Sequence, residues 1–200
     1  MSSLITWVLA AASTLSPGRS HEPLAEAIVE QAEGEAALFQ GDDDRKKTSA
    51  LLVAIAFRES SLRPDAVGDH VGGKPTSFCA FQIHLPWGSK TPEGWTGPDL
   101  ATDPKKCVTT AMRMLRMSMR VCPSHPIAWY AAGPAGCASP RAQRISRDRV
   151  ALAQRLIRDV SAKDQEQTQQ TTPSRALFGI EPLLDPERLH LVRERSNRNS

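Results

Sequence analysis

The most restrictive feature of this sequence is an apolar run, LLVAIAF, at residues 51–57. Wound into a helix, the run is apolar nearly all round, and a helix without a polar face belongs in the middle of a core. Thr48 or Ser49 is suited to cap the start of this helix. We expect the helix to end at Ser61, because Pro64 disfavours helical backbone at the residues just before it.

Composition and charge agree with one folded domain and exclude several classes of protein. The 200 residues are 40% apolar and 24% charged, enough to build a core and too apolar for wholesale disorder. No apolar run approaches the roughly 18–20 residues of a membrane span, so we expect no integral membrane segment. A net charge of +3 and a single Tyr give little basis for binding nucleic acid. We expect a monomer with no nucleic-acid partner.

Helical patterns also occur before the apolar run. Residues 4–12 (LITWVLAAA) fit a first helix stopped at residues 16–18, or the apolar part of an export signal, and both interpretations stay open. No Lys or Arg precedes this stretch, so it is not a convincing signal peptide. Residues 21–38 repeat apolar positions at helical spacing.

After the apolar run we expect a turn, a strand, a loop and three more helices. The glycine-rich residues 68–73 predict a turn region rather than an element. Residues 77–85 predict a strand with alternate residues on one side, and residues 86–104 predict a loop. Helices are expected at residues 103–121, 127–132 and 146–160, the last with an arginine-rich outer face. The expected fold class is mainly α (α+β).

The composition changes at residue 161, where a stretch rich in Gln, Thr and Ser begins. We expect one domain at residues 1–160 and a low-complexity linker and disordered tail at residues 161–200. A weak amphipathic patch in the tail is a candidate peptide for docking another protein; it comprises Leu177, Phe178, Leu183, Leu184, Leu189 and Leu191.

Four cysteines, with no C-x-x-C pair among them, favour two disulfides over a zinc site. Three pairings are possible. We favour Cys79–Cys107 with Cys122–Cys137, since each closes a short loop around one predicted element; four free thiols are the alternative. His70 and His84 lack a third ligand at sensible spacing, so we expect no metal and no cofactor.

Glu59 is the first candidate for chemistry. It lies at the end of the apolar helix, where the negative helix terminus and apolar surroundings both disfavour its charged form. Both effects raise the pKa of the carboxyl, as a general acid requires. The alternative is a surface carboxylate, paired with Arg58 or in water.

Three blocks in order resemble the lytic transglycosylase and goose-type lysozyme families. They are FRESSLRPDAVGD at residues 57–69, SFCAFQI at residues 77–83 and AWYAAG at residues 128–133. The resemblance covers about residues 45–160, the motif-bearing core of the domain. It implies a lysozyme-like fold with a small β-hairpin region beside the cleft.

The same resemblance implies a role for each matched residue. Glu59 would protonate the glycosidic oxygen. Ser60 would help hold the loop that carries Glu59 and would bind the substrate. Gln82 would line the sugar cleft, and Tyr130 would hydrogen-bond near Glu59. The sequence departs from the pattern where Cys79 replaces Gly, Phe81 replaces Met and Ala131 replaces Asn, and where the segment at residues 69–77 is longer.

Asp69 has two open interpretations. It is either an Asx-type turn residue or a second carboxylate that activates water. The implied activity is cleavage of the β-1,4 bond between N-acetylmuramic acid and N-acetylglucosamine in peptidoglycan. We expect a lytic transglycosylase giving 1,6-anhydro products; a hydrolytic lysozyme using Glu59 and Asp69, and an inactive glycan-binding or virion-structural relative, are the alternatives. The expected location is extracytoplasmic, periplasmic or secreted, or in a phage virion.

Overall fold

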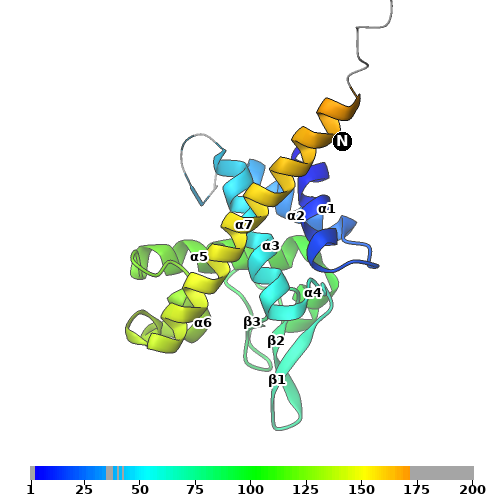
Figure 1. Ribbon diagram of the computed structural model, residues 1–200. Coiled ribbons are helices and arrows are strands. Elements are labelled where there is room, and N and C mark those ends of the chain that lie inside the picture. Colours follow the sequence, from blue (N-terminus) through cyan, green and yellow to red (C-terminus); the bar gives the residue numbers. More distant parts are fainter. Residues whose placement is uncertain (1–2, 35–37, 40, 42, 172–200) are drawn as a thin grey trace, which may run out of the picture. The chain divides into compact units, whose positions relative to one another are not determined.

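The computed structural model describes residues 3–34, 38–39, 41 and 43–171, and shows a mainly helical chain with one small antiparallel sheet. The chain divides into two compact units, residues 1–165 and 166–200, and every element except the end of α7 lies in the first. The elements are α1 (Ser3–Leu15), α2 (Glu22–Glu33), α3 (Asp44–Ser60), β1 (Val67–Val71), β2 (Lys74–Phe78), β3 (Ile83–His84), α4 (Gly97–Thr102), α5 (Pro104–Val121), α6 (Ala128–Ala132), the 3-10 helix η1 (Gly133–Ala138) and α7 (Pro140–Thr171) (Figure 1).

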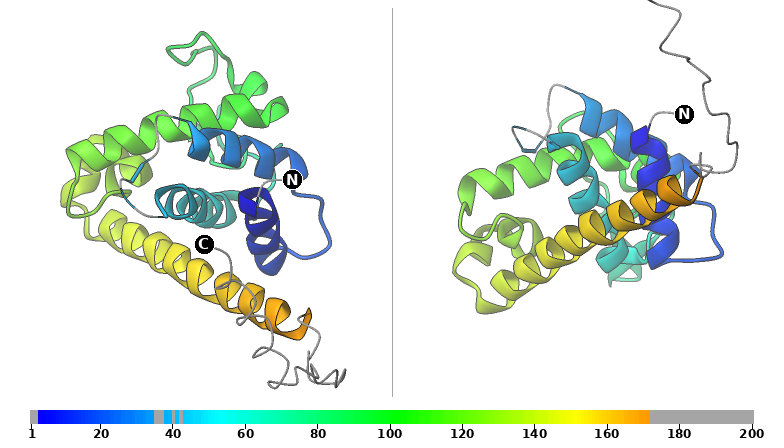
Figure 2. Two further views of the ribbon diagram at one scale, coloured as in Figure 1. Left: turned by 90° about the horizontal axis from the view of Figure 1, so that it is seen from above. Right: turned by 45° about the horizontal axis from the view of Figure 1, so that its top comes forward.

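Helix α3 is the centre of the core, as its apolar run predicts. Every residue from Ala50 to Ala56 is at most 2% exposed. Figure 2 shows α3 surrounded by α1, α2, α5 and α7. The predicted first helix is confirmed as α1, whose buried face includes Trp7 and Val8. The predicted helix at residues 21–38 is shorter, because α2 ends at Glu33 and is followed by the extended backbone of Gly34.

The predicted cap of α3 is wrong. The helix begins at Asp44, one turn earlier, so Thr48 and Ser49 lie buried inside it. The Thr48 hydroxyl accepts a hydrogen bond from the backbone N–H of Leu38 at 3.2 Å, outside the helix. The predicted end is confirmed: Ser61 is the C-cap with a left-handed φ of 56°. Glu59 therefore lies in the last turn of a buried helix.

A β-hairpin follows α3 where the glycine-rich segment predicted only a turn. The turn itself is Gly72–Gly73, both with positive φ (58° and 77°), which is the backbone of a two-residue hairpin turn. The residues on either side pair as β1 and β2, with Val71 opposite Lys74 and Gly68 opposite Ser77. The prediction missed these strands because their residues are mostly polar and lack apolar alternation.

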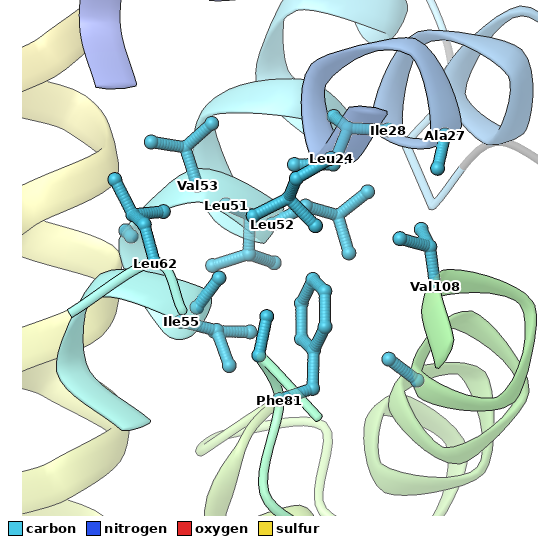
Figure 3. Packing of buried hydrophobic residues seen from close by; sticks show 14 of the residues in the cluster. Leu24, Ala27, Ile28, Leu51, Leu52, Val53, Ile55, Leu62, Phe81 and Val108 are labelled. Carbon is cyan, nitrogen blue, oxygen red and sulfur yellow. The ribbon is translucent and has the colours of Figure 1, made fainter. Parts of the chain in front are cut away.

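The predicted strand at residues 77–85 is interrupted. The chain leaves the sheet after Phe78, turns, and returns as β3, and Cys79 and Gln82 take positive φ values of 62° and 46°. Alternation fails because both sides are covered: Phe78 and Ala80 are as buried as Cys79 and Phe81. Figure 3 shows the Phe81 ring inserted among Leu52, Ile55 and Val108, which accounts for the inward turn.

Helix α4 interrupts the predicted loop at residues 86–104. A capping box starts it: the Thr96 side chain accepts from the N–H of Asp99, and Asp99 accepts from the N–H of Thr96. The predicted start of the next helix is confirmed, since Pro104 opens α5 and Asp103 caps it. The face of α5 with Val108, Met112 and Leu115 is buried in the core, as its spacing predicts.

Both predicted disulfides are present. Cys79–Cys107 joins the turn after β2 to the first turn of α5, and Cys122–Cys137 joins the end of α5 to η1. The sheet and the loop around α6 are therefore each fastened covalently to α5.

The last helix is longer than predicted at both ends. It begins at Pro140 instead of residue 146, and it continues past residue 161 to Thr171. The change of composition at residue 161 therefore does not end the helix, because Gln, Lys, Asp and Glu are compatible with helical backbone. The amphipathic patch that begins at Leu177 lies outside the described residues.

Candidate active site

A cleft of about 540 Å³ opens beside the end of α3. It brings together four of the predicted site residues, which are Glu59, Asp69, Gln82 and Tyr130. Its other lining residues are Ser77, His84, Met114, Trp129, Ala131, Ala132, Gly133 and Pro134. The sheet, α3, α5 and the α6–η1 segment thus each supply part of one site.

Glu59 is paired with an arginine of α7 that lies 90 residues later in the sequence. The Arg149 Nη2 donates to Glu59 Oε1 at 2.5 Å, and the two side chains are only 9% and 20% exposed. The predicted surface pair with Arg58 is wrong, because Arg58 pairs with Asp148 at 3.0 Å. Sequence reasoning missed Arg149, since it is one of several arginines on a helix whose arginine face was expected in solvent.

The pKa of Glu59 is raised above its ordinary value. Burial is the largest cause, because it disfavours the charged carboxylate. The guanidinium of Arg149 acts in the opposite direction through its charge and its hydrogen bond, and the negative charge of Asp69 adds a smaller upward effect. Arg149 therefore favours the ionised form of this carboxyl, whereas burial and the charge of Asp69 favour its protonated form.

Asp69 lies in β1 and not in a turn, so the turn interpretation is wrong. Its backbone has a positive φ of 45°, which Asp tolerates better than most residues. Its exposed carboxylate accepts a hydrogen bond from the Ser77 hydroxyl at 2.7 Å, and its backbone carbonyl accepts from Thr76. These bonds across the hairpin hold Asp69 in the wall of the cleft, where its charge acts on Glu59.

Gln82 reaches the cleft from the strained turn between β2 and β3. Its amide nitrogen donates to the Cys79 carbonyl at 3.1 Å. Its Oε1 lies so close to Gly68 that a Cβ built on that glycine would be 2.5 Å away. Gly68 is therefore required for this orientation of the Gln82 side chain.

Tyr130 closes the other side of the cleft from α6. Its hydroxyl donates to the Phe81 carbonyl, in the turn that carries Gln82. The pKa of the phenol is raised well above its ordinary value, first by burial and then by the negative charge of Glu59. Tyr130 thus lies within the electrostatic reach of Glu59, but its hydrogen bond goes to the backbone.

Ser60 is buried beneath the site and does not line the cleft. Its Oγ lies within hydrogen-bond distance of two carbonyls that can accept its single proton, those of Ala56 (3.1 Å) and Ala80 (2.9 Å), and it accepts from the N–H of Arg63 (3.1 Å). It therefore ties the end of α3 to the turn after β2, which agrees with the loop-holding role that the resemblance implies. No cleft-facing atom of Ser60 remains for a substrate.

The other eight lining residues were not singled out as site residues from the sequence, and three of them have large side chains. Trp129 and Met114 add apolar surface, and His84 adds an imidazole. Trp129 is next to Tyr130 in the matched AWYAAG block, which was the available signal. Ala131 also lines the cleft, so the position where the family has Asn contributes no amide. Among the described residues, no three His, Cys, Asp or Glu side chains are grouped as a metal site requires.

Comparisons of the chain with protein-family models, with curated proteins and with solved structures found no match. Within the part of the chain that the structure describes, no helix has the length and apolar composition to span a bilayer.

Proposed function

We propose that this protein cleaves the glycan strands of peptidoglycan as a lytic transglycosylase, without a cofactor. The observation that carries the proposal is Glu59, a largely buried carboxyl with a raised pKa that lines a cleft of about 540 Å³. A carboxyl whose pKa is raised keeps its proton to higher pH, which is what the acid in glycosidic bond cleavage requires. The order of the three sequence blocks, all of which contribute to this cleft, points to the same chemistry.

In this mechanism Glu59 acts twice. It first donates its proton to the glycosidic oxygen, the bond from that oxygen to C1 of N-acetylmuramic acid breaks, and N-acetylglucosamine leaves. The Glu59 carboxylate then takes the proton from the C6 hydroxyl of the same muramic acid as O6 bonds to C1. The product is a 1,6-anhydro ring, no water is consumed, and Glu59 regains its proton.

Fold and location belong to the same proposal. A helix that ends at the acid, a hairpin beside the cleft and a short helix facing it support a lysozyme-like arrangement of the first unit. Two disulfides support a location outside the cytoplasm, either in the cell envelope or on a phage particle, because such bonds persist in oxidising surroundings.

The second candidate is a hydrolytic lysozyme, and Asp69 is the observation that favours it. Its carboxylate lines the same cleft and contributes to the raised pKa of Glu59. In a hydrolase Asp69 would activate a water molecule for attack on C1.

Asp69→Asn, with analysis of the products by mass, separates the two reactions and tests the proposal. Purified peptidoglycan digested by the wild type should give 1,6-anhydro ends, and the variant should lose less than about tenfold in rate. Removing a general base usually costs 10²-fold or more. A loss of that size with ordinary reducing ends would assign the protein to the hydrolases. No products from the wild type would leave only the inactive glycan-binding or virion-structural relative.

Gly68→Ala should lower the cleavage rate with little effect on stability. The new Cβ would displace Gln82 Oε1, which is the end of a flexible side chain, so the fold loses little while the cleft changes shape. We expect a loss of about tenfold, since small displacements in an active site can cost up to about 10²-fold. The control is the same change in a Gln82→Ala background, where Gly68→Ala should have no further effect on the rate. An equal loss in both backgrounds would contradict the role of Gln82.

A further inference from the structure

Two ion pairs join α3 to α7, and the cation comes from α3 in one pair and from α7 in the other. Consecutive residues of α3, Arg58 and Glu59, pair with consecutive residues of α7, Asp148 and Arg149. The Arg58–Asp148 pair is open to solvent, with side chains 42% and 48% exposed, and such pairs contribute little to stability. The Glu59–Arg149 pair lies mostly out of water.

The pair with Glu59 is the main interaction of the Arg149 side chain among the described residues. Its Nη1 donates to the Ile145 carbonyl at 3.4 Å, a long contact within its own helix, and its buried Nε has no hydrogen-bond partner among the described residues. Among the described residues, the 2.5 Å bond from Nη2 to Glu59 is the one short hydrogen bond of this guanidinium, which stays charged throughout the pH range of folded proteins. A buried charge of this kind needs its counter-charge.

We propose that Arg149 is the positioning residue of the catalytic acid: it fixes Oε1 of Glu59 and stabilises the carboxylate that exists between the two proton transfers. This inference rests on the proposed function. Among the described residues no hydrogen bond is made by Oε2, so that oxygen is left for the proton that moves to and from the glycan.

The charged and titratable groups around Glu59 determine the direction of the effect. Arg149 faces it from α7, Asp69 from β1 and Tyr130 from α6, while His84 of β3 lines the same cleft. Burial and Asp69 raise the pKa of Glu59, and Arg149 lowers it. Arg149 therefore keeps the carboxyl acidic enough to release its proton, although its surroundings favour the protonated form.

Arg149→Met should move the alkaline limb of the pH–rate profile to higher pH. Activity requires protonated Glu59 and falls as pH rises through its pKa. An opposite charge at hydrogen-bond distance lowers a carboxyl pKa by about 1–3 units, so its removal should shift the limb upward by at least about one unit. Because the carboxylate intermediate loses its partner, kcat should fall about tenfold or more, while KM should change little. Arg149→Lys, which keeps the charge, should restore part of both effects.

Arg58→Met is the matched control, because it removes an arginine one residue from Glu59 whose pair is exposed. Its limb and kcat should equal those of the wild type. Titration of the Glu59 side-chain carboxyl by NMR in the full chain gives a second reading that needs no turnover, and Arg149→Gln, which also removes the charge, takes the place of Arg149→Met if that variant does not fold. An unchanged Glu59 titration or an unmoved limb in either neutral variant would overturn this inference. A wild type without activity on peptidoglycan would instead overturn the proposed function, while the titration would still report on Arg149.

Discussion

Glu59→Gln is expected to abolish cleavage of purified peptidoglycan in a protein that still folds, with a lower unfolding temperature because the buried Arg149 loses its counter-charge. Glutamine is nearly isosteric with glutamate, but its amide cannot donate a proton to the leaving oxygen. Its carbonyl oxygen can still accept from Arg149 Nη2, so the buried guanidinium keeps a hydrogen-bond partner. We expect a loss of at least about 10²–10⁴-fold in turnover, the contribution of a general acid. Release of soluble muropeptides measures the rate, and thermal unfolding checks the fold.

Glu30→Gln is the matched control for that loss. Glu30 also forms an ion pair across two helices, with Lys105 at 2.7 Å, but both side chains are more than half exposed. Its replacement should leave turnover and unfolding temperature unchanged. Activity of Glu59→Gln within tenfold of the wild type would rule out Glu59 as the acid.

Removal of the Cys79–Cys107 bridge should produce the largest change in stability. The bridge closes a loop of 28 residues, and the chain-entropy model assigns a loop of that size about 3–4 kcal/mol. Both cysteines are buried in the main core, and Cys79 begins the turn that presents Gln82. The paired variant Cys79→Ala with Cys107→Ala should therefore lose about that much free energy of unfolding in a denaturant titration and also lose activity.

The second bridge provides the comparison within the same chain. Cys122–Cys137 closes a loop of 15 residues, so its removal by a paired alanine variant should cost slightly less, about 3 kcal/mol. Thiol titration of the denatured wild type should detect four thiols only after reduction. Equal stability of wild type and both paired variants would show that these bridges do not stabilise the fold.

Local sequence signals were sufficient to predict the core helix α3, the start of α5 and the two disulfides. The all-apolar run of α3, the Asp-Pro start of α5 and the spacing of the four cysteines each predict what the structure has. The hairpin was missed because β1 is an exposed edge strand and most residues of β1 and β2 are polar. The strand at residues 77–85 was overextended because burial on both sides removes alternation.

The site was predictable where its residues lie in the three matched sequence blocks, and not outside them. Glu59, Asp69, Gln82 and Tyr130 all lie in those blocks, whereas Arg149 follows Glu59 by 90 residues and lies in none of them. On its own helix Arg149 is indistinguishable from the exposed arginines. Only the packing of α7 against α3 distinguishes it, and that packing depends on the whole fold.

Helix α3 also determines where this protein tolerates mutation. From Leu52 to Glu59 the helix rises about 10 Å at about 1.5 Å per residue, so the acid is rigidly connected to side chains packed on all sides. Adding or removing one methylene in that packing would displace the Glu59 carboxyl. Random libraries that include α3 would therefore contain few active members. The exposed hairpin turn at Gly72–Gly73 has no such connection to the core. Under the proposed function, a change of glycan preference would therefore be accessible through the hairpin, while substitutions in α3 should rarely be tolerated.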